Sequence, residues 1–294
     1  MSRVVLAREA EWPRRLGELG PFPAPARLFV EGSPLPEDDA LVVAVVGTRR
    51  PTGIGLRVAQ ELATDLCAAG VVVVSGLAVG IDAAAHRATL EASGHTVAVL
   101  GCGLDVDYPH RNLRLKQRLV RSGTLVSEYP EGVQPARHHF PRRNRIIAGL
   151  SDGVVVVEGA ITSGALVTAR LALDCNREVF AVPGSVRNPM AQGPNELIRT
   201  SQAALVTSAA DILEELAPCV AAMSPSPAFC EPQALSFEEA ALLRALDDVP
   251  LSLEHICSSA QLEPGAAAAA LSRLELHALV ERTVAGYSRA APRR

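Results

Sequence analysis

Short apolar runs of strand length recur between residues 41 and 182, and this pattern constrains the fold more than any other feature of the chain. Segments with the helical spacing of apolar residues separate the runs. Runs that are apolar throughout are typical of strands buried on both faces, and their alternation with helices is typical of a parallel sheet covered by helices. The sequence therefore predicts an α/β fold built on a parallel, doubly wound sheet. The predicted strands are 41–46, 71–74, 97–100, 125–126, 154–157 and 179–182, and the predicted helices are 55–69, 81–92, 113–120 and 166–174.

Segments of different character flank this α/β domain, which is predicted to span residues 41–217. Residues 1–40 are rich in proline and are predicted to be a lead-in that packs on the main domain and ends in a short strand at 27–30. Residues 218–234 contain several prolines and serines, which predicts a linker. Three helices and a β-hairpin are predicted in residues 235–294, which is the outline of a winged helix. The helices are 236–246, 253–258 and 264–276, and the hairpin strands are 279–282 and 287–289.

The charge of this C-terminal domain argues against duplex DNA as its partner. Residues 236–294 contain eight acidic residues and six arginines, and Arg273 is the one basic group of the third helix. Binding to a duplex needs several cations on one face to neutralise phosphates. Duplex binding by the winged helix is therefore doubtful, and a regulatory or partner-binding role is the better prediction.

The composition of the whole chain excludes some classes of protein. The net charge is −4, so binding of nucleic acid must depend on a local basic patch and not on overall basicity. The six cysteines are scattered, without the spacing of a zinc site, and no metal or other cofactor is predicted. No apolar run approaches the roughly 20 residues that span a bilayer, and no signal peptide is evident. The sequence predicts a soluble, cytoplasmic protein.

One local basic patch lies around Phe140. No acidic residue occurs from 132 to 151, whereas four arginines and two histidines lie between 137 and 145. Pro141 suits the first position of a helix, and this would place the following arginines at the positive end of that helix, where anions bind. The alternative is a solvated basic helix start whose Ile146 and Ile147 pack on the sheet. The segment by itself leaves both interpretations open.

The loops that follow the predicted strands are rich in glycine and hydroxyl residues. Such loops let backbone N–H groups approach an anion, although a single loop of this kind is explained by the need for a tight turn. Recurrence at several strand ends favours a phosphate site. Neither GxGxxG nor GxxxxGK[ST] occurs, so a dinucleotide or P-loop site is not predicted. The loops are 47–49, 75–77, 101–103, 158–164 and 183–185.

Candidate catalytic groups are few. Asp82 and His86 share a helix face, but the simpler interpretation is that Asp82 caps this helix and that His86 is satisfied locally. Glu158 and Ser163 lie at a strand end, and no catalytic motif accompanies them. We therefore predict that the protein is not an enzyme. The alternative is a nucleotide or nucleoside-phosphate hydrolase that uses the same loops, with Glu158 or Asp82 as the acid or base.

Several ordered motifs resemble the bacterial DNA processing protein A (DprA/Smf) family over roughly residues 42–205. The resemblance implies an extended Rossmann fold that binds single-stranded DNA without catalysis. It also implies a homodimer that protects incoming DNA and loads the recombinase RecA during natural transformation and homologous recombination. The residues of the resembling motifs are 47–49, 75–82 with His86, 101–103 with Tyr108-Pro109, 140–151, 163–169 and 177–184.

The resemblance also implies roles for individual residues. Thr48, in place of the family's usual serine, and Arg49 would hold a phosphate, Arg137 would be a basic DNA contact, and Phe140 would stack on a base. The segment 200–203 departs from the family's usual glycine-alanine ending near the dimer contacts, so no dimer residues are assigned. The predicted DNA-binding residues are Gly47, Thr48, Arg49, Gly101, Gly103, Arg137, Phe140, Arg143, Asn144, Arg145, Ser163 and Gly164.

Overall fold

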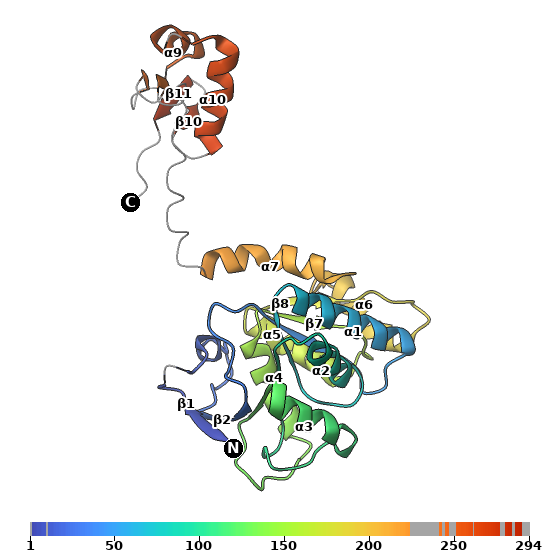
Figure 1. Ribbon diagram of the computed structural model, residues 1–294. Helices are drawn as coiled ribbons and strands as arrows, with labels where there is room; N and C mark the ends of the chain where they lie inside the picture. Colours follow the sequence, from blue (N-terminus) through green and yellow to red (C-terminus); the bar gives the residue numbers. More distant parts are fainter. Residues whose placement is uncertain are drawn as a thin grey trace. The chain divides into compact units, whose positions relative to one another are not determined.

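The computed structural model describes residues 2–9, 11–223, 241–242, 245–246, 251–260, 262–276, 280–283 and 286–289 (Figure 1). The chain divides into two compact units, Met1–Ser224 and Pro225–Arg294. Each unit is described by itself. Within the described residues, no helix combines the length and the hydrophobicity needed to cross a membrane.

A nine-stranded sheet forms the centre of the first unit. Its strand order is β1-β2-β6-β5-β4-β3-β7-β8-β9. All neighbours from β6 to β9 are parallel, whereas β2 pairs antiparallel with β6 and β1 pairs antiparallel with β2. The predicted doubly wound sheet is thus present, with an antiparallel extension at one edge. The strands are β1 Arg3–Leu6, β2 Arg27–Gly32, β3 Val42–Val46, β4 Val72–Ser75, β5 Thr96–Leu100, β6 Thr124–Ser127, β7 Gly153–Val156, β8 Glu178–Ala181 and β9 Ala204–Leu205.

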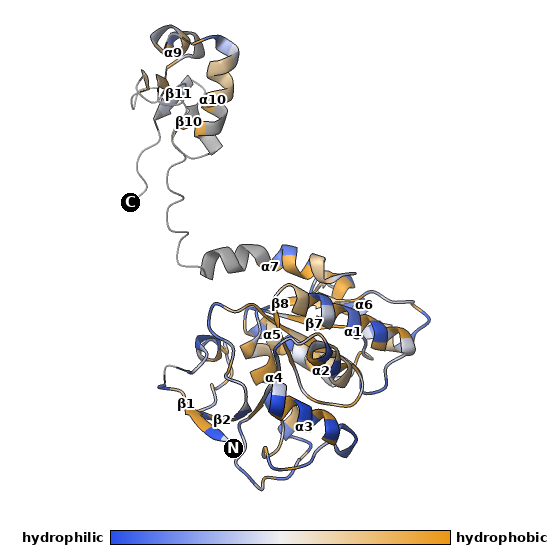
Figure 2. Cartoon of the chain, in the orientation of Figure 1, coloured by the Kyte–Doolittle hydropathy of each residue, from blue (hydrophilic) through white to orange (hydrophobic). Residues whose placement is uncertain are grey.

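Helices cover both faces of the sheet. Apolar residues of α1, α2 and α7 form a core on one face, and those of α4, α5 and α6 form a core on the other. A third core joins α3 to β5 and β6. Figure 2 shows hydrophilic and hydrophobic residues mixed along α3, as expected for a helix with one buried face. The helices are α1 Gly53–Ala68, α2 Ile81–Glu91, α3 Leu113–Ser122, α4 His139–Leu150, α5 Gly164–Asp174, α6 Gln192–Arg199 and α7 Ala209–Met223.

The residues of β3 explain why the strand sequences are apolar throughout. Val42, Ala44 and Val46 pack in the core with α4 and α5, whereas Val43 and Val45 pack in the core with α1 and α2. Successive strand residues point to opposite faces, so a strand that is covered on both sides needs an apolar residue at every position. Burial of each valine side chain contributes about 1.5–3 kcal/mol.

The lead-in, residues 1–40, contains more secondary structure than the one short strand predicted at 27–30. It contributes β1, β2 and the 3-10 helix η1, Arg14–Gly17. Leu16 and Leu19 are buried against the core, and Trp12 packs partly against it. The sequence analysis did not predict β1, whose apolar run is short; only Val5 of this edge strand is buried.

Helix α4 begins earlier than Pro141, which was predicted to be its first residue. The helix starts at His139, and Pro141 is its third residue. The first four N–H groups of a helix have no partner within the helix, so proline is tolerated at this position as well. The positive end of the helix therefore includes Phe140.

The C-terminal part of the chain comprises helix α7, which closes the first unit, and the second unit. Helix α7 continues to Met223 and so occupies the start of the predicted linker at 218–234, whose remainder lies outside the described residues. In the second unit, α9 Leu253–Ala260 and α10 Pro264–Leu276 precede the antiparallel strands β10 Val280–Thr283 and β11 Gly286–Arg289. The predicted helix 236–246 lies largely outside the described residues, although Leu242 and Leu246 belong to the core of this unit.

Candidate nucleic-acid interface

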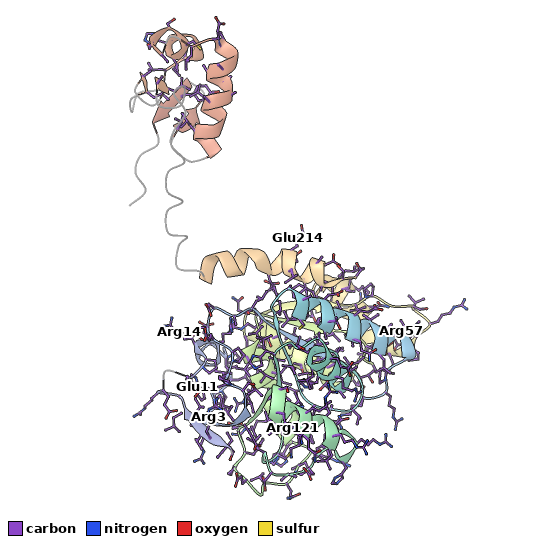
Figure 3. The ribbon with its side chains drawn as sticks, in the orientation of Figure 1. Arg3, Glu11, Arg14, Arg57, Arg121 and Glu214 are labelled. Atoms are coloured by element: carbon purple, nitrogen blue, oxygen red, sulfur yellow. The ribbon has the colours of Figure 1, made fainter. Side chains whose placement is uncertain are left out.

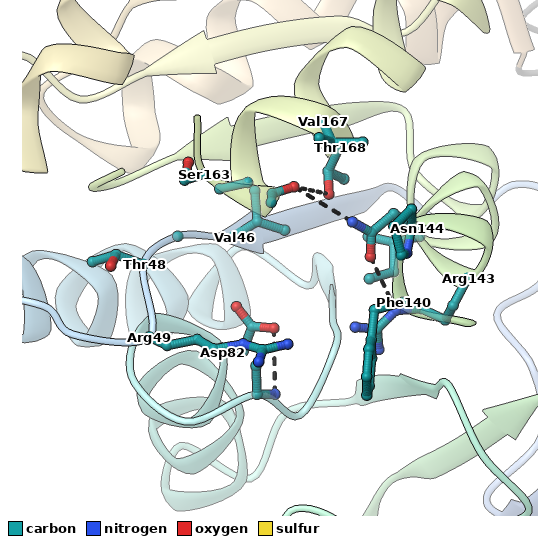
Figure 4. A pocket seen from close by; sticks show the side chains of 16 residues that line it. Val46, Thr48, Arg49, Asp82, Phe140, Arg143, Asn144, Ser163, Val167 and Thr168 are labelled. Carbon is teal, nitrogen blue, oxygen red and sulfur yellow. Dashed lines mark hydrogen bonds between the residues drawn. The ribbon is translucent and has the colours of Figure 1, made fainter. Parts of the chain in front are cut away.

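A pocket of about 270 Å³ opens at the carboxyl end of β3, where α4 and α5 begin (Figure 4). The chain order reverses across the sheet here, since β3 lies between β4 and β7. Ligands of doubly wound folds bind in the crevice at such a switch point. Eight of the predicted residues line this pocket: Gly47, Thr48, Arg49, Phe140, Arg143, Asn144, Ser163 and Gly164.

Arg49 and Phe140 form one wall of the pocket from distant parts of the chain. The guanidinium carbon of Arg49 lies 5.4 Å from the centroid of the Phe140 ring. Arg49 is exposed, and no acidic side chain in the described part of the chain forms an ion pair with it. Tyr108 approaches the same ring, with the centroids 5.6 Å apart. The wall thus combines an available positive charge with an aromatic surface, which suits a phosphate next to a flat base.

The amino end of α5 forms the opposite wall. Its N-cap Ser163 makes no capping hydrogen bond, and the Ser163 Oγ is buried without a partner within the described residues. The backbone N–H groups at this end, from Gly164 onward, point out of the helix at its positive pole. Together with the hydroxyl of Thr48, they provide donors for an anion.

Glycine at position 47 permits the close packing of this site. A Cβ atom there would lie 2.5 Å from the Cγ1 of Ile81, which is the first residue of α2. Gly101 likewise lets Phe140 approach, since its Cβ would lie 3.0 Å from the Cδ1 of the ring. Gly101, Tyr108 and Phe140 line a second cavity of about 50 Å³ beside the first.

Arg143 lines the pocket, but its donors point into the protein. Its Nη1 donates to the carbonyl of Gly76 at 2.8 Å and to that of Val99, and its Nε donates to Asn144 Oδ1 at 3.1 Å. Burial lowers the pKa of Arg143 to about 10, and the nearby Asp82 opposes this shift. The side chain therefore holds the ends of β4 and β5 and supports Asn144.

Arg145 does not reach the pocket. Its Nη2 forms an ion pair with Glu128 at 2.6 Å, and both side chains are largely buried. Arg142 contacts the same carboxylate at 3.4 Å from the surface. Both interpretations of the basic segment thus apply, because Phe140 faces the pocket while Arg145 and Ile146 belong to the packing of α4.

Two further predicted residues lie outside the pocket. Gly103 is packed closely in its own loop, where a Cβ would lie 2.7 Å from the carbonyl oxygen of Pro130. Arg137 is exposed on the segment before α4 and does not line either cavity. From this position Arg137 can contact a ligand only outside the two cavities.

Asp82 lines the pocket, although the sequence favoured a purely capping role for it. It is the second residue of α2, and its Oδ2 accepts hydrogen bonds from the N–H groups of Gly76 at 3.2 Å and Ala78 at 3.4 Å. Burial raises the pKa of Asp82, and Arg143 opposes the shift. Thr168, which follows Gly164 by one turn of α5, also lines the pocket and was not predicted. The helical spacing from Gly164 was the signal for it.

The other candidate catalytic groups serve the packing. His86 is fully buried, and its Nδ1 lies 2.7 Å from Thr96 Oγ1. Glu158 does not line the pocket, because its carboxylate accepts from the N–H and hydroxyl of Thr52 at 2.9 and 2.7 Å and from Asn188 Nδ2 at 3.2 Å. Among the residues described, no group of three or more His, Cys, Asp or Glu side chains is arranged to hold a metal ion.

Comparison with known families matches most of the chain. The model of the DNA recombination-mediator protein A family matches residues 3–217, and that of the DprA winged helix domain matches residues 224–286. The predicted resemblance and the predicted winged helix are both confirmed.

Individual relatives give the same result. The chain is 45% identical over 195 residues to the DNA processing protein DprA of Bacillus subtilis, covering 66% of this chain and 65% of that protein. It is 49% identical over 193 residues to protein Smf of Escherichia coli, covering 65% of this chain and 51% of that protein. The chain thus spans between half and two thirds of the length of these two curated relatives.

Two solved structures share the fold. One is DprA of Streptococcus pneumoniae, with a TM-score of 0.67, 41% identity and coverage of 72% of this chain and 74% of that one. The other is DprA of Helicobacter pylori, a single-stranded DNA-binding protein, with a TM-score of 0.66, 28% identity and coverage of 74% and 97%. These similarities confirm the mostly parallel α/β fold.

Proposed function

The chain belongs to the DNA recombination-mediator protein A family, and on this premise we propose that it binds single-stranded DNA in the pocket between β3, α4 and α5. In this role it protects incoming DNA and loads RecA recombinase during natural transformation and homologous recombination. The protein acts in the cytoplasm. These roles extend to this chain what its family membership implies.

The observation that carries the proposal is the junction of three features in one pocket. These are the exposed guanidinium of Arg49, the ring of Phe140 at 5.4 Å from it, and the amino end of α5. A phosphate next to a stacked base needs all three, because the charge and the amides hold the phosphate while the ring holds the base. Phosphates and flat base faces occur in DNA of every sequence, so binding in this pocket is largely independent of the DNA sequence.

Individual roles follow from the positions of the side chains. The phosphate is held by four residues: Thr48, Arg49, Ser163 and Gly164. Phe140 stacks on a base, and Arg137 contacts the DNA strand outside the pocket. Gly47 and Gly101 permit the close approach of the pocket walls. Asn144 adds a polar side chain to the edge of the pocket, and Arg143 supports Asn144 by a hydrogen bond. Gly103 and Arg145 act indirectly, by holding their segments in place.

The protein is proposed to be non-catalytic. Glu158 accepts hydrogen bonds from Thr52 and Asn188, and Asp82 accepts from backbone amides, so within the described part of the chain neither forms an acid/base pair with a second side chain. The alternative hydrolase predicts release of base or phosphate from nucleotides. Turnover of nucleotides that is not inhibited by long single strands would favour this alternative.

The proposed partners are single-stranded DNA, RecA and a second copy of the chain. The homodimer rests on the family alone. No partner is assigned to the winged helix, for which binding to duplex DNA stays doubtful because of its acidic excess.

A salt titration of oligonucleotide binding tests the function. Arg49→Ala removes one phosphate contact, so affinity should fall and the dependence of log Kd on log salt should decrease by about 0.7. Phe140→Leu keeps an apolar side chain but loses the aromatic face. It should weaken binding by about 1–3 kcal/mol with little change in the salt dependence.

Arg121→Ala is the matched control, since Arg121 is an exposed arginine in the last turn of α3, where the chain enters β6 (Figure 3). This variant should bind as the wild type does. Equal affinities for all four proteins over the titration would reject the proposed site.

A further inference from the structure

One carboxylate oxygen in the wall of the pocket has no hydrogen-bond partner among the residues that the structure describes. Asp82 is only 7% exposed, and its Oδ2 accepts from Gly76 and Ala78. No described residue donates a hydrogen bond to its Oδ1, although the side chain lines the pocket together with Phe140 and Thr168 (Figure 4). This oxygen is not among the buried atoms that lack a partner, so it is open to the pocket and can accept from a donor on a ligand there.

The cations near Asp82 do not supply that donor. Arg143 directs its Nη1 and Nε to carbonyl and amide oxygens. Arg49 is close enough to influence the carboxylate electrostatically, but no ion pair joins the two side chains within the described part of the chain. The Oδ1 is therefore available to a ligand as an acceptor.

The ligand that the proposed function places here is a nucleobase on Phe140. Bases differ in what they present at the ring edge. Cytosine, adenine and guanine carry an exocyclic amino group, whereas thymine and uracil carry a carbonyl oxygen at the position of the cytosine amino group. The N3–H of uracil is no equivalent donor, because it lies between two carbonyl oxygens that a carboxylate repels.

We propose that Asp82 gives the pocket a preference for a nucleobase with an exocyclic amino group over thymine or uracil. This inference rests on the proposed function of the pocket and adds one position of base readout to a binder that is otherwise tolerant of sequence. Asp82 acts as a specificity-determining residue whose Oδ1 accepts one N–H of the amino group.

Substitution by asparagine should reverse the preference. The N–H groups of Gly76 and Ala78 both need an acceptor, so the amide oxygen of Asp82→Asn takes the place of Oδ2. Its NH₂ group must then face the pocket. A donor replaces the acceptor, and the carbonyl oxygen of uracil becomes the favoured group.

The experiment compares the binding of oligo(dC) and oligo(dU) of equal length at neutral pH. The two share ring size, stacking area and phosphates, and they differ at the edge that Asp82 would read. For the wild type, the Kd for oligo(dU) should exceed that for oligo(dC) by about tenfold. For Asp82→Asn, this ratio should fall to one or below.

Asp211→Asn is the matched control. Asp211 also lies in the first turn of a helix, and its Oδ2 accepts from the N–H groups of Thr207 and Ser208, but it lies on α7, outside the pocket. This variant should keep the wild-type ratio. Oligonucleotides of N4,N4-dimethylcytosine, which lack the amino N–H groups, should bind to the wild type about as weakly as oligo(dU) does.

The outcomes separate this inference from the proposed function. Equal wild-type affinity for oligo(dC) and oligo(dU), with Arg49→Ala still weakening both, would overturn the role of Asp82 alone. Wild-type protein that binds neither oligonucleotide would overturn the function itself. If Asp82→Asn fails to fold, the dimethylcytosine oligonucleotide tests the inference with the wild-type protein. Binding of this oligonucleotide as tight as that of oligo(dC) would contradict the inference.

Discussion

At the scale of single residues, His86 shows how a polar side chain becomes part of the core. Thr96 Oγ1 donates to the carbonyl of Val73 at 2.7 Å, so it must accept from the Nδ1–H of His86. The Nδ1 therefore carries a proton. The buried Nε2 has no acceptor to share a second proton among the described residues, which favours the neutral imidazole. Burial, aided by Arg143 and Arg87, lowers the pKa of His86 to about 3.

This lowered pKa makes the fold sensitive to mild acid. Below pH 6.5 the unfolded chain binds a proton at His86 that the folded chain does not bind until about pH 3, so stability is lost as the pH falls through this window. Between pH 7 and pH 5, His86 should account for a loss of about 2 kcal/mol in the free energy of unfolding. Urea denaturation at both pH values measures it.

For His86→Gln, this part of the loss should be absent, although the variant is less stable at pH 7. The exposed His110 provides the control, and His110→Gln should lose as much stability on acidification as the wild type does. If His86→Gln showed the full wild-type loss, the assignment to His86 would be wrong.

At the scale of elements, a buried ion pair joins the lead-in to the sheet. Arg15 of η1 contacts Asp152 at 3.0 Å, directly before β7, and donates to the carbonyls of Asp38 and Ala40 at 3.0 and 2.6 Å. Asp152 Oδ2 also accepts from the N–H of Val42 at 2.8 Å. One arginine thus connects three segments that the sequence separates widely.

Arg15→Met should lower the free energy of unfolding by about 3–5 kcal/mol, because it leaves Asp152 buried without its partner. Arg14 is the neighbouring control. It also pairs with an aspartate, Asp38, but its side chain is 86% exposed. Arg14→Met should therefore change stability by less than about 1 kcal/mol. Similar effects of the two substitutions in thermal or urea unfolding would show that the buried pair does not stabilise the lead-in.

The elements also show why some predictions succeeded and others failed. Strands such as β3 are buried on both faces, so their own residues identify them, whereas β1 depends on its pairing with β2 and has only Val5 buried. The roles of Arg143 and Arg145 depend on partners that lie far along the chain, namely Val99 and Glu128. No local pattern in the basic segment distinguishes an arginine that faces a ligand from one that faces a carbonyl or a carboxylate.

At the scale of the whole molecule, the site belongs to one unit. Every residue that lines the pocket lies between Val46 and Thr168, within the unit Met1–Ser224. The motifs identified eight of these residues, because strand-end loops converge in a parallel sheet. For Asp82 the sequence analysis preferred a capping role, because only the structure shows that its side chain lines the pocket while the loop amides bind its Oδ2.

Removal of residues 225–294 should therefore leave the affinity for single-stranded DNA within about threefold of the full chain, a change of less than about 0.7 kcal/mol. Fluorescence anisotropy with a labelled oligonucleotide measures this change. Duplex DNA should bind weakly to both proteins, because the winged helix has more acidic than basic residues. A large loss of duplex affinity on truncation would instead identify the second unit as a duplex reader.

The place of Trp12 gives the protein a built-in optical probe. It is the single tryptophan of the chain, and it packs against the core from the lead-in, while the pocket is lined by other segments. Its emission therefore reports detachment of the lead-in and should stay constant when an oligonucleotide binds. Comparison of this signal with circular dichroism during unfolding would show whether the lead-in separates before the sheet melts or together with it.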